Sequence, residues 1–106
     1  MIIQSTPLKD AFTVDIKPFQ DERGFFGPSH NDQEFKKHGI NLKIVEQNIS
    51  FNRFKGTMRG LHFQTAPHAQ AKLIRVTQGV LYDVIVDIRP ESATFKKSFS
   101  VELSAK

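Results

Sequence analysis

Short apolar segments separated by turn residues recur along the chain. Residues 12–17 alternate apolar and polar side chains, residues 42–46 are mostly apolar, and residues 72–77 lead through Gly79 into the long apolar stretch 80–88. An apolar side chain at every second position is typical of a strand with one buried face. We therefore predict strands over these segments and an antiparallel hairpin with Gly79 in its turn.

One stretch has the signals of a short helix instead. Asn31 is followed three residues later by Glu34, which is a capping-box pattern for a helix N-terminus. Phe35 supplies the apolar anchor, and Gly39 stands where the helix should end, because glycine readily adopts the left-handed conformation found there. We predict a helix of about two turns.

The expected elements are therefore many short strands and one small helix. Residues 99–104 alternate once more, and neither an internal repeat nor a low-complexity segment is evident. This pattern predicts the all-β class, in the form of a sandwich or barrel. No break in composition marks a linker, so we expect a single domain over residues 1–106.

Composition narrows the type of protein. Hydrophobic residues make up 39% and charged residues 25% of the chain, which is a globular composition. The sequence has no cysteine, which excludes disulfides and thiolate metal ligands and fits the cytoplasm, where we expect the protein. No apolar stretch approaches the length that spans a bilayer, so we expect no membrane segment.

The formal net charge of +4 favours anionic partners. The lysines and arginines are spread along the chain, and solvated surface charge explains most of them. On charge alone, nucleic acid and a phosphorylated metabolite are both candidates. A strand-borne platform of stacking aromatic residues with interleaved basic ones would support nucleic-acid binding. None is evident, so we expect no nucleic-acid binding.

Polar side chains near the centre of the chain are candidates for chemistry. In an extended chain, His62 and Gln64 point to the face opposite Leu61 and Phe63. Taken alone, such a pair is more often structural than functional. Lys72 stands at the end of an apolar row of the expected strand. It could act in a site, or it could simply extend its ammonium group into water.

The stretch 80–88 places two carboxylates among aliphatic side chains. Tyr82 falls on one face of the expected strand, and Asp83 and Asp87 fall on the other. A buried carboxylate must be paired or hydrogen-bonded, because its desolvation is costly. Pairing of Asp83 with a lysine or arginine and a role of Asp83 in a site are equally good interpretations.

The spacing of Gly56, His62, Gln64, Lys72 and Gly79 resembles the first motif of the cupin superfamily. In that motif a glycine, two histidines, a glutamate and a closing glycine build two strands of a jelly-roll barrel. Here Gln64 takes the place of the second histidine and Lys72 that of the glutamate. A metal site would thereby lose a nitrogen ligand and gain a cation, so we expect no metal. His62 is then free for proton transfer.

Five sequence blocks make the resemblance specific to one family. They are Asp21-Glu-Arg-Gly-Phe-Phe26, Asn48-Ile-Ser-Phe51, Gly56-Thr-Met-Arg-Gly-Leu-His-Phe-Gln64, Ala71-Lys-Leu73, and Tyr82-Asp-Val-Ile-Val-Asp-Ile-Arg89 followed by Ser92-Ala-Thr94. Their content and order resemble the dTDP-4-dehydrorhamnose 3,5-epimerase family over nearly the whole chain. Each block is weak alone, but chance explains five in order poorly.

The resemblance implies an enzyme without metal or cofactor that epimerises a dTDP-linked 4-keto-6-deoxyhexose in deoxysugar biosynthesis of the rhamnose type. His62 matches the family's base, which removes the protons alpha to the ketone at C5 and then C3; histidine suits this role because it exchanges protons near neutral pH. Lys72 matches the lysine that stabilises the enolate oxygen. Asp83 matches a carboxylate that orients Lys72 or His62.

The same resemblance implies the nucleotide contacts. Arg23 and Arg59 match arginines that bind the nucleotide, and the planar guanidinium fork suits a diphosphate. The other positions that match substrate or nucleotide contacts are Phe26, Gln47, Asn48 and Gln64. Some family members reach across a dimer with the strand that carries Arg23, so a homodimer is implied.

Family members continue well past Lys106, and their later part supplies a tyrosine that reprotonates the opposite sugar face and an aspartate partner of the base. We therefore expect this chain to lack the C-terminal part of the epimerase domain. The alternative function is a non-catalytic, nucleotide-sugar-binding cupin that lost the general acid. Tyr82, the single tyrosine, is not expected to be that acid, because it faces away from Asp83.

Overall fold

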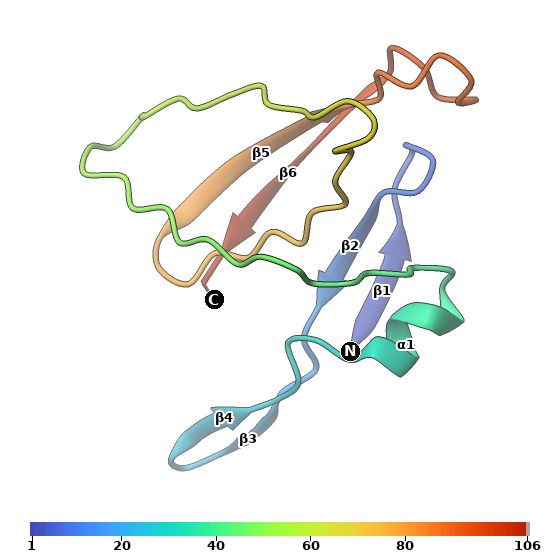
Figure 1. Cartoon of the computed structure of the whole chain (residues 1–106). Helices are drawn as coiled ribbons and strands as arrows, with labels where there is room; N and C mark the ends of the chain where they lie inside the picture. The colour runs from blue at the N-terminus through green and yellow to red at the C-terminus, as the bar shows by residue number, and fades with distance from the viewer. Residues whose placement is uncertain (106) are drawn as a thin grey trace. The chain divides into compact units, whose positions relative to one another are not determined.

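The computed structural model describes residues 1–105 and contains six strands and one helix in that range. The strands form three two-stranded antiparallel sheets (Figure 1). They are β1 (Ile2–Ser5) with β2 (Phe12–Asp15), β3 (Phe19–Asp21) with β4 (Gly24–Phe26), and β5 (Val80–Val86) with β6 (Ser98–Ser104). The helix, α1, spans Asp32–Lys37. The prediction of many short strands with one small helix is confirmed.

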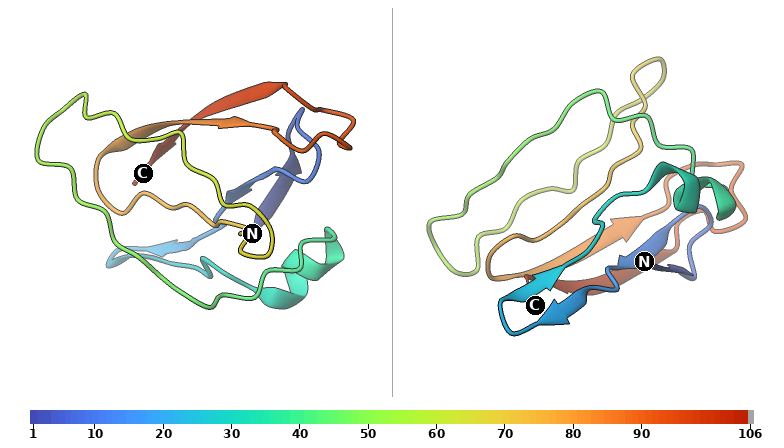
Figure 2. Two further views of the ribbon diagram at one scale, coloured as in Figure 1. Left: turned by 45° about the horizontal axis from the view of Figure 1, so that its top comes forward. Right: turned by 90° about the horizontal axis from the view of Figure 1, so that it is seen from below.

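The chain divides into two compact units. The first unit consists of Met1–Leu42 and Arg75–Lys106, and it holds every helix and strand found among the described residues. The second unit, Lys43–Ile74, contains turns and bends but no helix or strand, although all of its residues are described. In Figures 1 and 2 it is the green-to-yellow stretch that carries no arrow.

The helix α1 forms where the sequence predicts it. The Asn31 side chain accepts a hydrogen bond from the backbone N of Glu34 at 3.0 Å, which satisfies a donor that the first turn leaves free. The Glu34 carboxylate pairs with Lys37 at 2.6 Å instead of returning to the cap, so half of the capping box is present. Gly39 has φ +73° and follows the last turn. Phe35 is only 1% exposed and anchors the helix.

The longest hairpin joins β5 and β6, which pair along their whole length. In β6 the apolar side chains are half-buried and the serines are exposed, as the alternation of residues 99–104 predicts. The strand predicted over residues 80–88 is confirmed from Val80 to Val86. The strand predicted over residues 12–17 is likewise confirmed from Phe12 to Asp15.

Two predicted strands are wrong, and so is the hairpin predicted at Gly79. Residues 42–46 and 72–77 are described and belong to no strand, and β5 pairs with β6 instead of the segment before Gly79. An alternating pattern shows that a segment suits a sheet surface, but a strand forms only where a neighbour completes the ladder. Residues 72–77 make no backbone hydrogen bond with any residue of 1–105. The short strands β1, β3 and β4 escape pattern recognition because they contain only three or four residues.

Little apolar surface is buried within residues 1–105. Leu8 and Phe35 are the buried apolar residues of this range, and both belong to the first unit. In the second unit Ile49 and Met58 are 99% and 92% exposed. Exposed apolar surface on this scale is typical of regions that associate with further protein.

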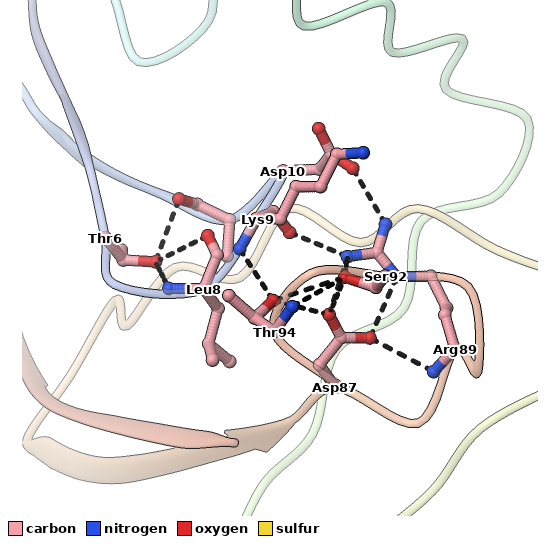
Figure 3. Close-up of polar contacts among 9 residues, drawn as sticks. Thr6, Leu8, Lys9, Asp10, Asp87, Arg89, Ser92 and Thr94 are labelled. Atoms are coloured by element: carbon pink, nitrogen blue, oxygen red, sulfur yellow. Dashed lines mark hydrogen bonds and ion pairs between the residues drawn. The ribbon is translucent and has the colours of Figure 1, made fainter. Parts of the chain in front are cut away.

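Asp87, just after β5, is a buried carboxylate with a complete set of partners (Figure 3). It accepts hydrogen bonds from Arg89 Nε at 2.9 Å, Ser92 Oγ at 2.5 Å and Thr94 Oγ1 at 2.7 Å. The Arg89 guanidinium, followed by the two hydroxyl groups, holds the pKa of Asp87 well below its usual range. Ionised Asp87 therefore stabilises the turn that joins β5 to β6.

The same cluster ties this turn to the turn between β1 and β2. Arg89 Nη1 pairs with Asp10 at 2.8 Å, and Arg89 Nη2 donates to the backbone O of Lys9 at 2.8 Å. The backbone N of Lys9 in turn donates to Thr94 Oγ1 at 3.0 Å. Segments about eighty residues apart in sequence are thus held by side chains of one cluster.

Asp87→Asn is expected to lower the melting temperature by roughly 10 °C, the scale expected when several buried hydrogen bonds are lost in a small domain. The new amide NH₂ would meet the donors of Arg89, Ser92 and Thr94. Thermal unfolding followed by circular dichroism measures the effect, and exposed Asp15→Asn is the matched control. Equal melting of the two variants would contradict the role of the cluster.

The contribution of Asp87 also depends on pH. Because its pKa is depressed in the folded protein, its stabilisation is fully present above the ordinary aspartate pKa of about 3.9 and is lost progressively as the pH falls below that value. Below about pH 4 the melting temperature of the unmodified chain should therefore fall more steeply than that of Asp87→Asn.

Candidate functional site

The second unit carries the net positive charge of the chain. It has five basic residues and one acidic residue, Glu46, whereas the rest of the sequence has ten of each. The five are Lys43, Arg53, Lys55, Arg59 and Lys72. Every ion pair among residues 1–105 lies in the first unit. The second unit therefore presents cations that are not ion-paired within this range, and it suits an anionic ligand.

Arg59 is held in a defined orientation within the second unit. Its Nε donates to Asn52 Oδ1 at 2.6 Å, and its Nη2 donates to the backbone O of Phe51 at 3.4 Å. Both acceptors are neutral, so the guanidinium keeps its full charge. Nη1 makes no hydrogen bond with any residue of 1–105, so its two N–H donors are available to a ligand.

His62, Gln64 and Lys72 lie exposed in the same unit. Within the described range their side chains make no hydrogen bond or ion pair. The predicted two-faced arrangement of residues 61–64 is not imposed by a sheet, because this segment forms no strand. Gly60 has φ +101°, and a Cβ there would lie 3.6 Å from His62 Nδ1, so glycine permits this backbone turn beside the imidazole.

The predicted nucleotide contacts Gln47 and Asn48 are exposed in the second unit. The Asn48 side-chain Nδ2 donates to Glu46 Oε1 at 2.7 Å. This contact orients the Asn48 amide and leaves its carbonyl oxygen free to accept a hydrogen bond. Glu46 is the single carboxylate of the unit, and this contact engages it locally.

Arg23 and Phe26 come together in the first unit, on the β3–β4 hairpin. Both line a hollow of about 530 Å³ along this hairpin. Asp21 accepts hydrogen bonds from Arg23 Nη2 at 2.5 Å and from Arg23 Nε at 3.2 Å. The guanidinium lowers the pKa of the Asp21 carboxyl below its usual range. The hairpin thus carries an ion-paired arginine and an exposed aromatic ring that line the same hollow.

Asp83 is half-buried in β5, opposite Val101 of β6. It forms no ion pair within residues 1–105, so the pairing with lysine or arginine considered from the sequence is not present there. The buried, paired carboxylate is Asp87, four residues later. Tyr82 points to the other face of the strand, as the alternation predicts, and it donates its hydroxyl hydrogen to Ser100 Oγ at 2.9 Å.

Two contributors were not identified from the sequence. Asn52 is an ordinary exposed residue seven positions from Arg59, and no motif distinguishes it. The partnership of Asp87 with Arg89 had a detectable signal, because a carboxylate two residues before an arginine and five before Ser92 can close a polar turn. In both cases the hydrogen bonds of the side chains identified the residue and its partner.

The described part of the chain contains no cluster of side chains that could bind a metal. Among residues 1–105, no group of three or more histidine, aspartate or glutamate side chains is placed to hold a metal ion. Cysteine is absent from the sequence. The helix found among residues 1–105, α1, is far too short to span a bilayer.

The fold and the candidate residues define an all-β protein of cupin-like type with a cationic, histidine-containing segment. The family model for dTDP-4-dehydrorhamnose 3,5-epimerase matches residues 5–106. The chain belongs to this family.

Similar proteins agree on the family and the fold. The dTDP-4-dehydrorhamnose 3,5-epimerase of Salmonella typhimurium is 44% identical over 99% of this chain and 57% of its own length. That of Sinorhizobium fredii is 40% identical over 98% of this chain and 53% of its own length. The crystal structure of the Bacillus anthracis enzyme with TDP and PPi bound has a TM-score of 0.93 at 44% identity, over 98% of this chain and 59% of that one. This chain spans about half the length of the curated relatives it matches.

Proposed function

We propose that this chain carries the base and part of the nucleotide-binding site of a metal-independent 3,5-epimerase acting on a dTDP-linked 4-keto-6-deoxyhexose. The proposal rests on the composition of the second unit. Arg59, His62 and Lys72 occur together there, in a positively charged segment without ion pairs in the described range. The relatives are named dTDP-4-dehydrorhamnose 3,5-epimerase, and that name supports both the nucleotide sugar and the reaction.

His62 is the proposed base. Its neutral imidazole takes the proton alpha to the ketone at C5, and the electron pair of the broken C–H bond moves into an enolate. The Lys72 ammonium group stabilises the developing oxyanion, where a fixed cation has its largest effect. A proton delivered from water to the opposite face inverts C5, while the imidazolium returns the abstracted proton to water, and the same steps follow at C3. Asp83 is the proposed positioning residue for Lys72 or His62.

Six side chains are the proposed contacts to the nucleotide sugar. Arg59 is the main contact to the diphosphate, because its charge is uncompensated by carboxylates. Arg23 and Phe26 on the β3–β4 hairpin supply a second cation and an aromatic surface. The remaining proposed contacts are Gln47, Asn48 and Gln64. The exposed apolar side chains of the second unit support assembly as a homodimer, which we place in the cytoplasm.

A second candidate is a nucleotide-sugar-binding protein that does not turn over its ligand. The contacts of Arg59 favour it, because a guanidinium oriented by two neutral oxygens serves nucleotide binding whether or not a proton is transferred. Such a protein would keep the arginine contacts to the nucleotide and lack the acid that completes inversion.

One pair of measurements separates these functions. The chain is titrated with dTDP by calorimetry and then incubated with the dTDP-4-keto-6-deoxyhexose in D₂O, with deuterium at C5 followed by NMR. We expect binding of dTDP together with deuterium incorporation. Binding without incorporation would favour the second candidate. Failure to bind dTDP would contradict both.

A further inference from the structure

We propose that Asn52 is a positioning residue for Arg59, and that the site requires the neutrality of Asn52 as well as its hydrogen bond. This inference rests on the proposed function, in which Arg59 binds the diphosphate. Asn52 belongs to none of the motifs that define the candidate site, and only its contact with Arg59 identifies it.

The geometry fixes one edge of the guanidinium. Asn52 Oδ1 accepts from Nε at 2.6 Å, and the Phe51 backbone oxygen accepts from Nη2 at 3.4 Å. Arginine has five N–H donors in a rigid plane, so these two contacts set the plane and leave the Nη1 donors and one Nη2 donor for a ligand. Neighbouring donors in one plane match two oxygens of a phosphate group.

The other arginines with side-chain contacts in the described range are held differently. Arg23 is paired with the carboxylate of Asp21, and Arg89 with the carboxylates of Asp87 and Asp10. Such arginines are partly neutralised by their own fold, and an anionic ligand must compete with a built-in carboxylate. Arg59 alone among these three is oriented by neutral oxygens without a carboxylate partner.

A neutral orienting group has a physical advantage at an anion site. It removes the conformational freedom of a long side chain before the ligand arrives, which lowers the entropic cost of binding. It does so without adding a negative charge that would repel a diphosphate at short range. A carboxylate at position 52 would orient Arg59 equally well but would oppose the ligand.

The test compares Asn52→Ala, Asn52→Asp and the control Asn41→Asp, which adds the same charge at an exposed position of the first unit. Calorimetry with the full chain measures the affinity for dTDP and for inorganic pyrophosphate. We expect Asn52→Ala to weaken both by about 5- to 10-fold, from lost pre-organisation. Asn52→Asp should weaken both by about 100-fold with a shallower dependence on salt. Asn41→Asp should stay within about twofold.

A ligand-free measurement accompanies the titrations. The Arg59 Nε–H should exchange slowly with solvent in the unmodified chain and in Asn52→Asp, and rapidly in Asn52→Ala, because only alanine removes the acceptor. Equal exchange in the unmodified chain and Asn52→Ala overturns the contact. Binding by Asn52→Asp as tight as by Asn52→Ala overturns the requirement for neutrality.

The outcomes also separate this inference from the proposed function. If the unmodified chain binds dTDP and exchanges C5 while all variants bind alike, the inference about Asn52 is wrong and the function stands. If the variants rank as expected with pyrophosphate but dTDP-sugar shows no exchange at C5, the positioning role stands and the epimerase is wrong. Binding of neither dTDP nor pyrophosphate by the unmodified chain overturns both.

Discussion

Replacing His62 by alanine is expected to slow deuterium incorporation at C5 of the dTDP-4-keto-6-deoxyhexose by roughly 10²- to 10⁴-fold, the range over which a positioned general base accelerates proton transfer. The imidazole is exposed and makes no hydrogen bond within residues 1–105. Its removal therefore takes away the base without breaking a packed structure, and the melting temperature should hardly change.

His68→Ala is the matched control for this prediction. His68 lies in the same unit, and its recorded hydrogen bond comes from its backbone N to the Thr65 oxygen, which alanine preserves. We expect normal exchange in His68→Ala and affinities for dTDP within about threefold in both variants, because loss of a purely catalytic group spares ground-state binding. Exchange at the unmodified rate in His62→Ala would show that another group is the base.

Lys72→Met is expected to reduce exchange at C5 by roughly 10²- to 10³-fold, the effect of removing one stabilising group from a developing oxyanion. Methionine keeps much of the side-chain length and removes the charge. Because the oxyanion develops only as the proton leaves, the loss should fall on the rate of exchange, and the affinity for dTDP should change by less than about threefold.

A simple loss of positive charge must be separated from this effect. Lys43→Met removes the same charge from the same unit, and Lys43 is also exposed. We expect it to lower the affinity for dTDP slightly at low salt and to leave exchange unchanged. Equal rate losses in the two variants would mean that Lys72 acts through the general field of the segment and not at the enolate.

Local features could be predicted well from the sequence. The cap of α1, its buried Phe35 and its terminating Gly39 depend on residues within one or two turns of each other, and all three are confirmed. The alternation of β6 and the apolar residues of β5 also follow from local preferences, because such residues suit the surface of a sheet. These patterns are short-range, so a single sequence contains them.

Strand pairing could not be predicted in the same way. The apolar pattern of residues 72–77 is as regular as that of β5, but β5 pairs with β6 across the turn that Asp87 stabilises. A period of two specifies a face and not a neighbour. The partner follows from turn geometry and from contacts between distant segments, such as Arg89 with Asp10.

The candidate site shows the same division. Resemblance to the epimerase family identified His62, Lys72, Asp83 and Arg59, and their roles remain predictions. The supporting contacts came from side-chain geometry, because an exposed asparagine seven residues from an arginine has no signature in one sequence.

The sequence by itself therefore determined the all-β class, the capped helix and the family to which the chain belongs, because periodicity, capping and ordered motifs are written in adjacent residues. Only the tertiary structure decided that Asp87 and not Asp83 is the paired carboxylate, and that Asn52 orients Arg59. These choices depend on which donors and acceptors meet when the chain folds, since hydrogen bonds and ion pairs act over a few ångströms in space, whatever the separation along the chain.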